Sequence, residues 1–320
     1  MCKTAVFYGD ELAKYGFGIS HPFNSSRIHS FWSRLIKMDI DKLDKITIEK
    51  PKLAEEKDIE IFHNKKYIDS VKKNSIKAEG YLDHGDTPCF KGMFEASCYV
   101  VGSSMKALDL IMAKEKRLIH SFNPIGGLHH ARRDSAGGFC IFNDIGIVIT
   151  TARKKYDINR ICYVDIDAHH GDGVYYEFES DPHIFIADIH EDGRNLYPGT
   201  GDESESGRGG AKGTKLNIPL KPHSGDKEFI DAFKMVEEFI ETVAKPELIV
   251  LQCGADGIKG DPLTHLQYSS NMHRYAADKL HVLAHKHCDG KIIALGGGGY
   301  NQENIAEGWT QVIRSFTSNI

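Results

Sequence analysis

Short apolar runs alternate with longer amphipathic segments along most of the chain. Short runs bounded by turn-forming or charged residues are typical of buried strands. The strands predicted in this way cover residues 4–8, 117–122, 160–167, 183–190, 214–220, 248–256 and 291–299. Apolar residues at helical spacing predict helices over residues 21–38, 93–115, 227–244 and 269–285.

The alternation of strands with helices predicts an α/β fold with a mostly parallel sheet covered by helices on both faces. Residues 39–80 are rich in lysine and glutamate and have weak periodicity, which predicts short helices and loops with solvated faces. No linker, repeat or low-complexity block interrupts the pattern. We therefore expect one domain over residues 1–320.

The predicted strand at 160–167 passes directly into a cluster of acids and histidines, in the sequence YVDIDAHHGDG. Ligands of open α/β sheets bind beyond the carboxyl ends of the strands. Side chains two residues apart on an extended chain face the same way, so Asp165, Asp167 and His169 are predicted to address one point. Buried acids without partners are costly, which favours a charged or metal site here.

Three other predicted strands end in residues of the same kind. The loop 126–144 carries His129 and His130, the strand at 248–256 ends at Asp256, and four glycines precede Tyr300. Parallel strands would bring these ends to one edge of the sheet.

Together the strand ends supply the parts of an amide hydrolase. Asp167, His169 and Asp256 match the ligand number of a catalytic zinc site with an open position. Zinc lowers the pKa of a water, and a nearby histidine can act as general base and then as acid. Asp165 and Asp172 remain to orient the two histidines. Tyr300 is predicted to donate a hydrogen bond to the oxyanion.

Composition narrows the function classes. A net charge of −5 at pH 7 argues against a dedicated nucleic-acid binder. No run of 18 uncharged apolar residues is present, so we expect no membrane span. The first residues lack an apolar secretion signal, and the seven cysteines form no CxxC pair. We therefore expect a reduced, cytoplasmic protein.

The motifs HPFNSSRIH, GDTP, GGLHHARRDSAGGFCIFND, YVDIDAHHGDG, LYPGTGD, GADGIKGDPL and LGGGGYN occur in one order over nearly the whole chain. In this the sequence resembles the superfamily of zinc-dependent histone deacetylases and acetoin-utilisation deacetylases. The resemblance implies the three-layer arginase–deacetylase fold with an eight-stranded, mainly parallel sheet. It also implies hydrolysis of N-acetyl-lysine, in a protein or peptide, or of a small acylamine.

The resemblance implies a role for each motif residue. It pairs His129 with Asp165 and His130 with Asp172, and makes His130 the main base and acid. Tyr300 polarises the acetyl carbonyl. The implied ligands of one Zn²⁺ are Asp167, His169 and Asp256. The implied substrate-binding residues are Gly138, Phe139, Tyr197 and Leu263 along a tunnel, with Asp86 as the acid at its rim.

Two further features follow from the resemblance. Arg27 is expected at an internal cavity beneath the metal. A structural monovalent ion, for which K⁺ is one candidate, is expected beside Asp188, with Asp165 and the backbone of Asp167, His169 and Ile189 as its ligands. The chain departs from the pattern of eukaryotic nuclear members at Gly85, where an aromatic residue is usual. It also departs at Asp188, where serine is frequent, and this leaves the identity of the ion open.

Three alternatives remain. A two-manganese ureohydrolase needs further bridging acids, but Gly171 and Gly254 stand where they would be required. A non-catalytic acyl-lysine binder is expected to have lost a ligand, a histidine or the tyrosine, and all are present. An acetylpolyamine hydrolase would favour an acid at the tunnel mouth, where Leu263 stands. Asp86 at the rim could partly substitute for that acid, so this alternative stays open.

A second group of histidines occurs in HVLAHKHC at residues 281–288. His281 and His285 have the i, i+4 spacing of a metal site on a helix. Because this segment contains no acid, we predict the exposed end of an amphipathic helix instead.

Overall fold

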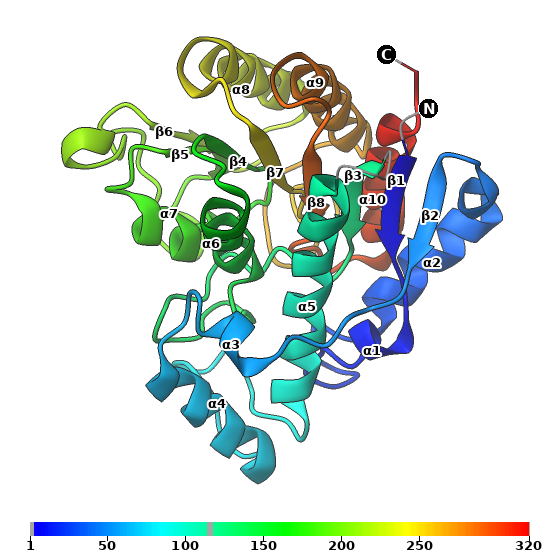
Figure 1. Cartoon of the computed structure of the whole chain (residues 1–320), viewed down its shortest axis with the longest axis vertical. Coiled ribbons are helices and arrows are strands. Elements are labelled where there is room, and N and C mark those ends of the chain that lie inside the picture. Colours follow the sequence, from blue (N-terminus) through cyan, green and yellow to red (C-terminus); the bar gives the residue numbers. More distant parts are fainter. Residues whose placement is uncertain (1–2, 114–117, 320) are drawn as a thin grey trace.

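The computed structural model of the chain describes residues 3–113 and 118–319. Eight strands form one sheet in the order β2-β1-β3-β8-β7-β4-β5-β6, and all neighbouring strands are parallel (Figure 1). The strands are β1 Lys3–Phe7, β2 Ile46–Glu49, β3 Leu118–Asn123, β4 Ile161–Asp165, β5 Ile184–Glu191, β6 Lys215–Leu220, β7 Leu248–Gln252 and β8 Ile292–Leu295. The predicted α/β architecture with an eight-stranded parallel sheet is confirmed.

Helices cover the sheet on both sides. They are α1 Asp10–Ala13, α2 Ser26–Lys37, α3 Glu56–Ile59, α4 Lys65–Lys77, α5 Met93–Met112, α6 Asp144–Tyr156, α7 Asp172–Phe178, α8 Asp226–Phe239, α9 Asn271–His287 and α10 Gln302–Phe316. The helix predicted over 227–244 is α8 continued by a π-helical turn, Ile240–Ala244. The helix predicted over 93–115 ends at Met112, and residues 114–117, which include the predicted start of β3, lie outside the described residues.

The strand β2 was missed by the sequence pattern, which predicted only short helices and loops between residues 39 and 80. This strand has four residues and pairs only with β1 at the edge of the sheet. Three of its side chains are half-buried and one is exposed, so it lacks the continuous apolar run of the central strands.

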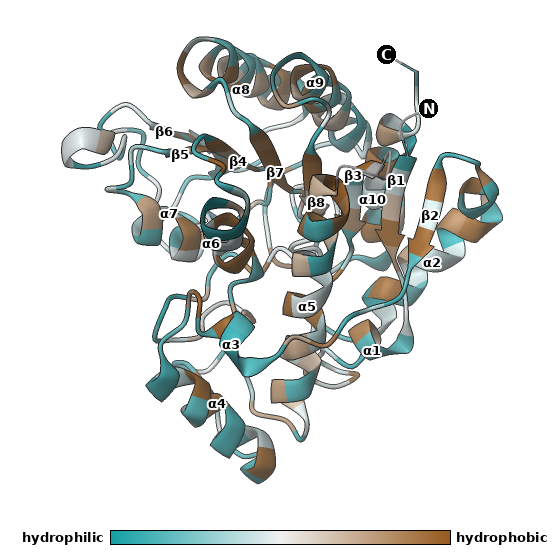
Figure 2. Cartoon of the chain, viewed as in Figure 1, coloured by the Kyte–Doolittle hydropathy of each residue, from teal (hydrophilic) through white to brown (hydrophobic). Residues whose placement is uncertain are grey.

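The core consists of two apolar layers, one on each face of the sheet. Alternate residues of β4 enter different layers: Ile161 and Tyr163 pack with α5 and α6, whereas Cys162 and Val164 pack with α8, α9 and α10. All residues of β4, β5, β7 and β8 are buried. Figure 2 shows hydrophobic central strands between helices that carry both hydrophobic and hydrophilic residues. No helix in the described ranges has the length and hydropathy needed to cross a bilayer.

The strand order explains how distant motifs meet. The strands β3, β8, β7 and β4 are neighbours in the sheet, although they are far apart in the sequence. The loops that follow them carry, respectively, the paired histidines, Tyr300, Asp256 and the acid–histidine cluster of residues 165–172. These four loops therefore start side by side at the carboxyl edge.

The helix α5 is crossed at close range by the backbone of residues 52–54. Ala54 N donates a hydrogen bond of 3.0 Å to Cys98 O on this helix. A Cβ at Gly102 would lie 2.1 Å from Lys52 O and 2.5 Å from Ala54 N. Since these atoms belong to the backbone, no side-chain rotation relieves the overlap.

We therefore expect Gly102→Ala to destabilise the protein, although alanine is the better helix former. Overpacking of this kind typically costs about 1–3 kcal/mol. Urea unfolding would measure the loss. Gly210→Ala is the control, because no atom lies within 4 Å of the added Cβ there. Equal unfolding midpoints for Gly102→Ala and the wild type would show that the crossing adjusts without strain.

Candidate active site

A compact group of metal-ligand side chains lies beyond the ends of β4 and β7. One ligand atom from each of Asp167, His169 and Asp256 lies within 4.8 Å of the others. His169 Nδ1 is 3.0 Å from Asp167 Oδ1 and 3.1 Å from Asp256 Oδ2. All three side chains are buried. One nitrogen and two carboxylates are a donor set that fits a zinc-type ion with room for a further ligand.

Neighbouring groups hold the two carboxylates in place. Ala168 N donates to Asp256 Oδ1 over 2.8 Å. Asp167 Oδ2 accepts hydrogen bonds from Gln252 Nε2 at 2.7 Å and from Gly298 N at 2.8 Å. Gln252 was not predicted as a site residue. The sequence offered one sign of it, a polar side chain at the end of the otherwise apolar strand β7.

The pKa values of the group describe the metal-free protein. Burial opposes the charged form of His169, but its hydrogen bonds with Asp167 and Asp256 outweigh this and raise its pKa to about 10. Burial and the charge of Asp167 raise the pKa of Asp256. Asp167 is also buried, yet His129 and His169 hold its pKa well below the usual range. Without a metal ion, His169 is therefore protonated at neutral pH, between the carboxylates of Asp167 and Asp256.

Two histidine–carboxylate pairs flank the metal-ligand group. His129 Nδ1 lies 2.8 Å from Asp165 Oδ2, and His130 Nδ1 lies 2.7 Å from Asp172 Oδ1. Arg132 Nη2 donates to the other oxygen of Asp172 over 2.9 Å. These are the pairs that the family resemblance implies. In each pair the Nδ1 atom is engaged, which leaves Nε2 as the nitrogen for other partners.

The two histidines differ in charge. Burial and the neighbouring charge of His129 lower the pKa of His130 to about 4. Burial also disfavours the charged form of His129, but Asp165 and Asp167 raise its pKa to about 9. In the metal-free protein at neutral pH, His130 is therefore neutral and His129 is charged.

Two of the residues expected around a monovalent ion, Asp165 and Asp188, are register partners on the neighbouring strands β4 and β5. Both oxygens of Asp188 are engaged: Oδ1 is 2.7 Å from His190 Nδ1, and Oδ2 accepts from Gly171 N at 2.9 Å. Burial opposes the charged form of His190, but Asp188 raises its pKa. His190 thus compensates the acid that distinguishes this chain from family members with serine there.

A cavity of about 240 Å³ leads from the surface to the metal-ligand group. All five predicted substrate-binding residues line it, together with residues of the catalytic group. Its lining is Asp86, His130, Gly138, Phe139, His169, Leu196, Tyr197, Leu263 and Tyr300.

The glycine loop before Tyr300 packs directly on the metal-ligand carboxylates. A Cβ at Gly298 would lie 2.3 Å from Asp256 Oδ2 and 2.8 Å from Asp167 Oδ2. Tyr300 N donates to Asp261 Oδ2 over 2.8 Å, and its ring meets that of Phe139 edge to face at 5.7 Å. Asp261 was missed at the sequence level, because a lone acid in a loop has no distinguishing pattern.

Arg27 fastens this loop from beneath. It is buried, and its guanidinium lies 3.8 Å from the centre of the Phe23 ring. Arg27 Nε donates to Gly299 O over 2.9 Å, and Nη2 donates to Gly297 O. The described contacts thus tie Arg27 to the backbone that carries Tyr300, and its place at an internal cavity stays a prediction.

The structure gives a steric reason for the missing acids of a two-metal site. A Cβ at Gly171 would lie 2.6 Å from Asp165 Oδ2, and one at Gly254 would lie 2.1 Å from Asp167 Oδ2. At each position an added side chain would displace one of these carboxylates. This geometry favours one metal ion over two.

The chain is similar to known proteins in sequence and in fold. The family model of the histone deacetylase domain matches residues 21–316. The acetoin utilization protein AcuC of Bacillus subtilis (strain 168) is 38% identical over 308 residues, which are 94% of this chain and 78% of that protein. AcuC of Staphylococcus aureus (strain MSSA476) is 34% identical over 322 residues, covering 98% of this chain and 82% of that protein.

A solved structure described as the crystal structure of the HDA15 HD domain superposes with a TM-score of 0.89 at 25% identity. The match covers 98% of this chain and 88% of that one. The fold is therefore the arginase–deacetylase fold. With the family model, the curated relatives and the solved structure in agreement, the chain belongs to the histone deacetylase family and is a deacetylase enzyme.

Proposed function

We propose that this deacetylase hydrolyses the amide bond of N-acetyl-lysine side chains and uses one zinc ion. The observation that carries the proposal is the cavity of about 240 Å³, which has aromatic and aliphatic walls and ends at His130, His169 and Tyr300. A narrow apolar passage suits the methylenes of an extended lysine chain. Its polar end would receive the acetyl group.

Asp167, His169 and Asp256 are the proposed ligands of the zinc ion. Zinc bound there supplies Lewis acidity, which polarises the carbonyl and lowers the pKa of a water. His130 takes the proton from the attacking water on Nε2, because its Nδ1 is held by Asp172 and it is neutral at physiological pH. It then delivers that proton to the leaving amine.

Tyr300 and His129 contribute charge stabilisation in this proposal. Burial raises the pKa of Tyr300 well above its usual value, so the hydroxyl keeps its proton and can donate it in a hydrogen bond. The oxyanion that forms on the former carbonyl is its acceptor. His129, charged and paired with Asp165, favours the same negative charge.

Asp86 lies at the rim of the cavity, in a turn that Asp83 holds by hydrogen bonds. Asp83 Oδ1 accepts hydrogen bonds from the backbone of residues 85, 86 and 87, which forms a tight acid-capped turn. Thr87 Oγ1 in turn accepts from Phe139 N at 3.1 Å. Asp86 itself is exposed at the mouth, where its carboxylate can accept from backbone amides of a peptide substrate.

Several sequence expectations belong to the same proposal. The whole of residues 1–320 acts as one catalytic domain, and a structural monovalent ion, for which K⁺ is one candidate, is expected beside Asp165 and Asp188. A cytoplasmic location is consistent with the six cysteines of the described ranges, all buried and unpaired. Leu263 at the mouth offers no charge to a second ammonium group, which favours acetyl-lysine, whereas Asp86 could partly take that role for an acetylated polyamine.

Removal of one hydroxyl tests the oxyanion role. We expect Tyr300→Phe to keep the fold and bound zinc while kcat falls about 10²–10³-fold, as is typical for loss of one oxyanion donor. Steady-state turnover of an acetyl-lysine peptide and the zinc content measure the two effects. A wild-type kcat would remove Tyr300 from the mechanism, and loss of zinc would make the tyrosine a residue that builds the site.

Zinc uptake should release a proton. Because the pKa of His169 is about 10 without metal, zinc must displace its proton at pH 7, and the raised pKa of Asp256 adds a further fraction. Between pH 6 and 8 the apparent affinity should therefore rise about tenfold per pH unit. Titration calorimetry in buffers of different ionisation enthalpy measures the released protons.

The control for zinc uptake is Asp256→Ala, in which the proton-releasing event should disappear. Heats that are independent of the buffer in the wild type would contradict the charge state assigned to His169.

Substrate class is tested by turnover of acetyl-lysine peptides beside N-acetylputrescine. We expect higher kcat/KM for the peptides in the wild type. Asp86→Ala should raise KM for the peptides and leave free N-acetyl-lysine nearly unaffected, since only the peptides offer backbone amides at the rim. Preference for the acetylated diamine would replace acetyl-lysine by a polyamine, and equal losses on both substrates would make Asp86 structural.

A further inference from the structure

A second cluster of histidines lies between the sheet and α9. His120 comes from β3, and His281 and His285 come from the last turns of α9. The prediction of an exposed helix end was wrong here: His281 is 2% exposed and His120 is fully buried. Sequence spacing did not reveal the third member, because His120 and His281 are 161 residues apart in the chain.

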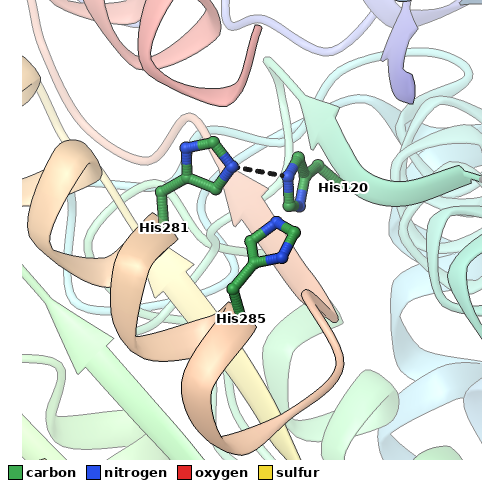
Figure 3. A group of neighbouring side chains, drawn as sticks. All are labelled: His120, His281 and His285. Atoms are coloured by element: carbon green, nitrogen blue, oxygen red, sulfur yellow. Dashed lines mark hydrogen bonds between the residues drawn. The ribbon is translucent and has the colours of Figure 1, made fainter. Parts of the chain in front are cut away.

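The three rings face a common point (Figure 3). One ring nitrogen of each lies within 4.8 Å of those of the other two, a spacing that the active-site group of Asp167, His169 and Asp256 also satisfies. His120 Nε2 is 3.0 Å from His281 Nε2. The ring of His285 is centred 5.5 Å from that of His120 and 5.0 Å from that of His281.

Hydrogen bonding within the protein leaves this cluster incomplete. The facing nitrogens of His120 and His281 can share one proton in a single hydrogen bond, and this bond leaves no place for His285. His285 Nε2 and His120 Nδ1 are buried and have no hydrogen-bond partner among the described residues. An unpaired buried polar atom destabilises the folded protein. A metal ion would accept one lone pair from each ring and so engage His285 as well.

The protonation state suits a metal. Burial and the neighbouring histidines lower the pKa of His120 to about 3 and that of His281 to about 4. Burial also lowers the pKa of His285. All three rings are therefore neutral at pH 7, which is the form that binds metals.

The position of the cluster separates it from the active site. His120 pairs with Ile292, the first residue of β8, so it lies near the amino ends of the strands. The active-site group follows the carboxyl ends. The partial negative charge at the carboxyl end of α9 favours a cation there. The charge of Asp278 on the same helix also favours a cation at His281, whereas the charge of Lys45 opposes it.

We propose that His120, His281 and His285 form a second metal site that binds one divalent ion of the zinc class through three neutral imidazoles. An all-nitrogen set suits zinc, nickel or copper and not magnesium or calcium. The fourth position is open to water or a small anion. Such an ion would link β3 to the end of α9 and stabilise the folded chain. The proposal is independent of the deacetylase mechanism.

The test counts zinc ions bound to chelator-stripped protein, with ZnCl₂ as the probe and elemental analysis after equilibrium dialysis. We expect about two ions in the wild type, about one in Asp256→Ala and about one in His285→Gln. His285→Gln should retain deacetylase activity, because it leaves the active-site group intact. The control is His287→Gln on the same turn, which should keep both ions, since His287 faces Glu241 at 3.2 Å.

One ion in the wild type and none in Asp256→Ala would overturn the proposal, as would two ions in His285→Gln. If Asp256 were not a zinc ligand of the active site, Asp256→Ala would bind as much zinc as the wild type. That result differs from the results that would overturn the second site. X-ray absorption of zinc in Asp256→Ala covers the case in which His285→Gln does not fold. Scattering from three imidazoles is expected there, and an oxygen-only shell or absence of bound zinc would contradict the site.

Discussion

Four carboxylates, Asp165, Asp167, Asp188 and Asp256, are almost fully buried at the carboxyl edge of the central strands, and the rest of the site is arranged to compensate them. Buried charges without partners are among the most costly features of a protein interior. Three histidines lie within hydrogen-bond distance of these acids, with further donors from Gln252 and the backbone. A divalent metal ion held there would complete this balance, because it would replace a proton by a doubly charged cation at the point where Asp167 and Asp256 meet.

The same compensation divides labour between the paired histidines. His129 lies beside two carboxylates and carries charge, while His130 is paired with an acid that also has Arg132 as a partner. Two adjacent residues of one loop thus have opposite protonation states in the metal-free protein. This difference arises from the side chains that face each ring, because the two histidines themselves lie next to each other in one loop.

Apolar runs predicted the central strands and the acids and histidines at their ends, including the proposed metal ligands Asp167, His169 and Asp256. The lining of the cavity was expected only from the family resemblance, because those residues form no pattern of their own. The apolar runs did not predict β2, whose half-exposed residues lack such a run. Gln252, Asp83 and Asp261 escaped for another reason: their roles depend on hydrogen bonds formed by turns and loops, and these leave no periodic pattern in the sequence. His120 belongs to the same class, since its partners come from a distant helix.

The tight packing around Gly171 and Gly254 also bears on how such enzymes diverge. At each position a single added carbon would overlap a carboxylate oxygen of the site. A change from glycine to aspartate, as a dinuclear relative of this fold would need, must therefore displace that carboxylate. The acids already present and the acids that a second metal ion would require thus compete for the same space.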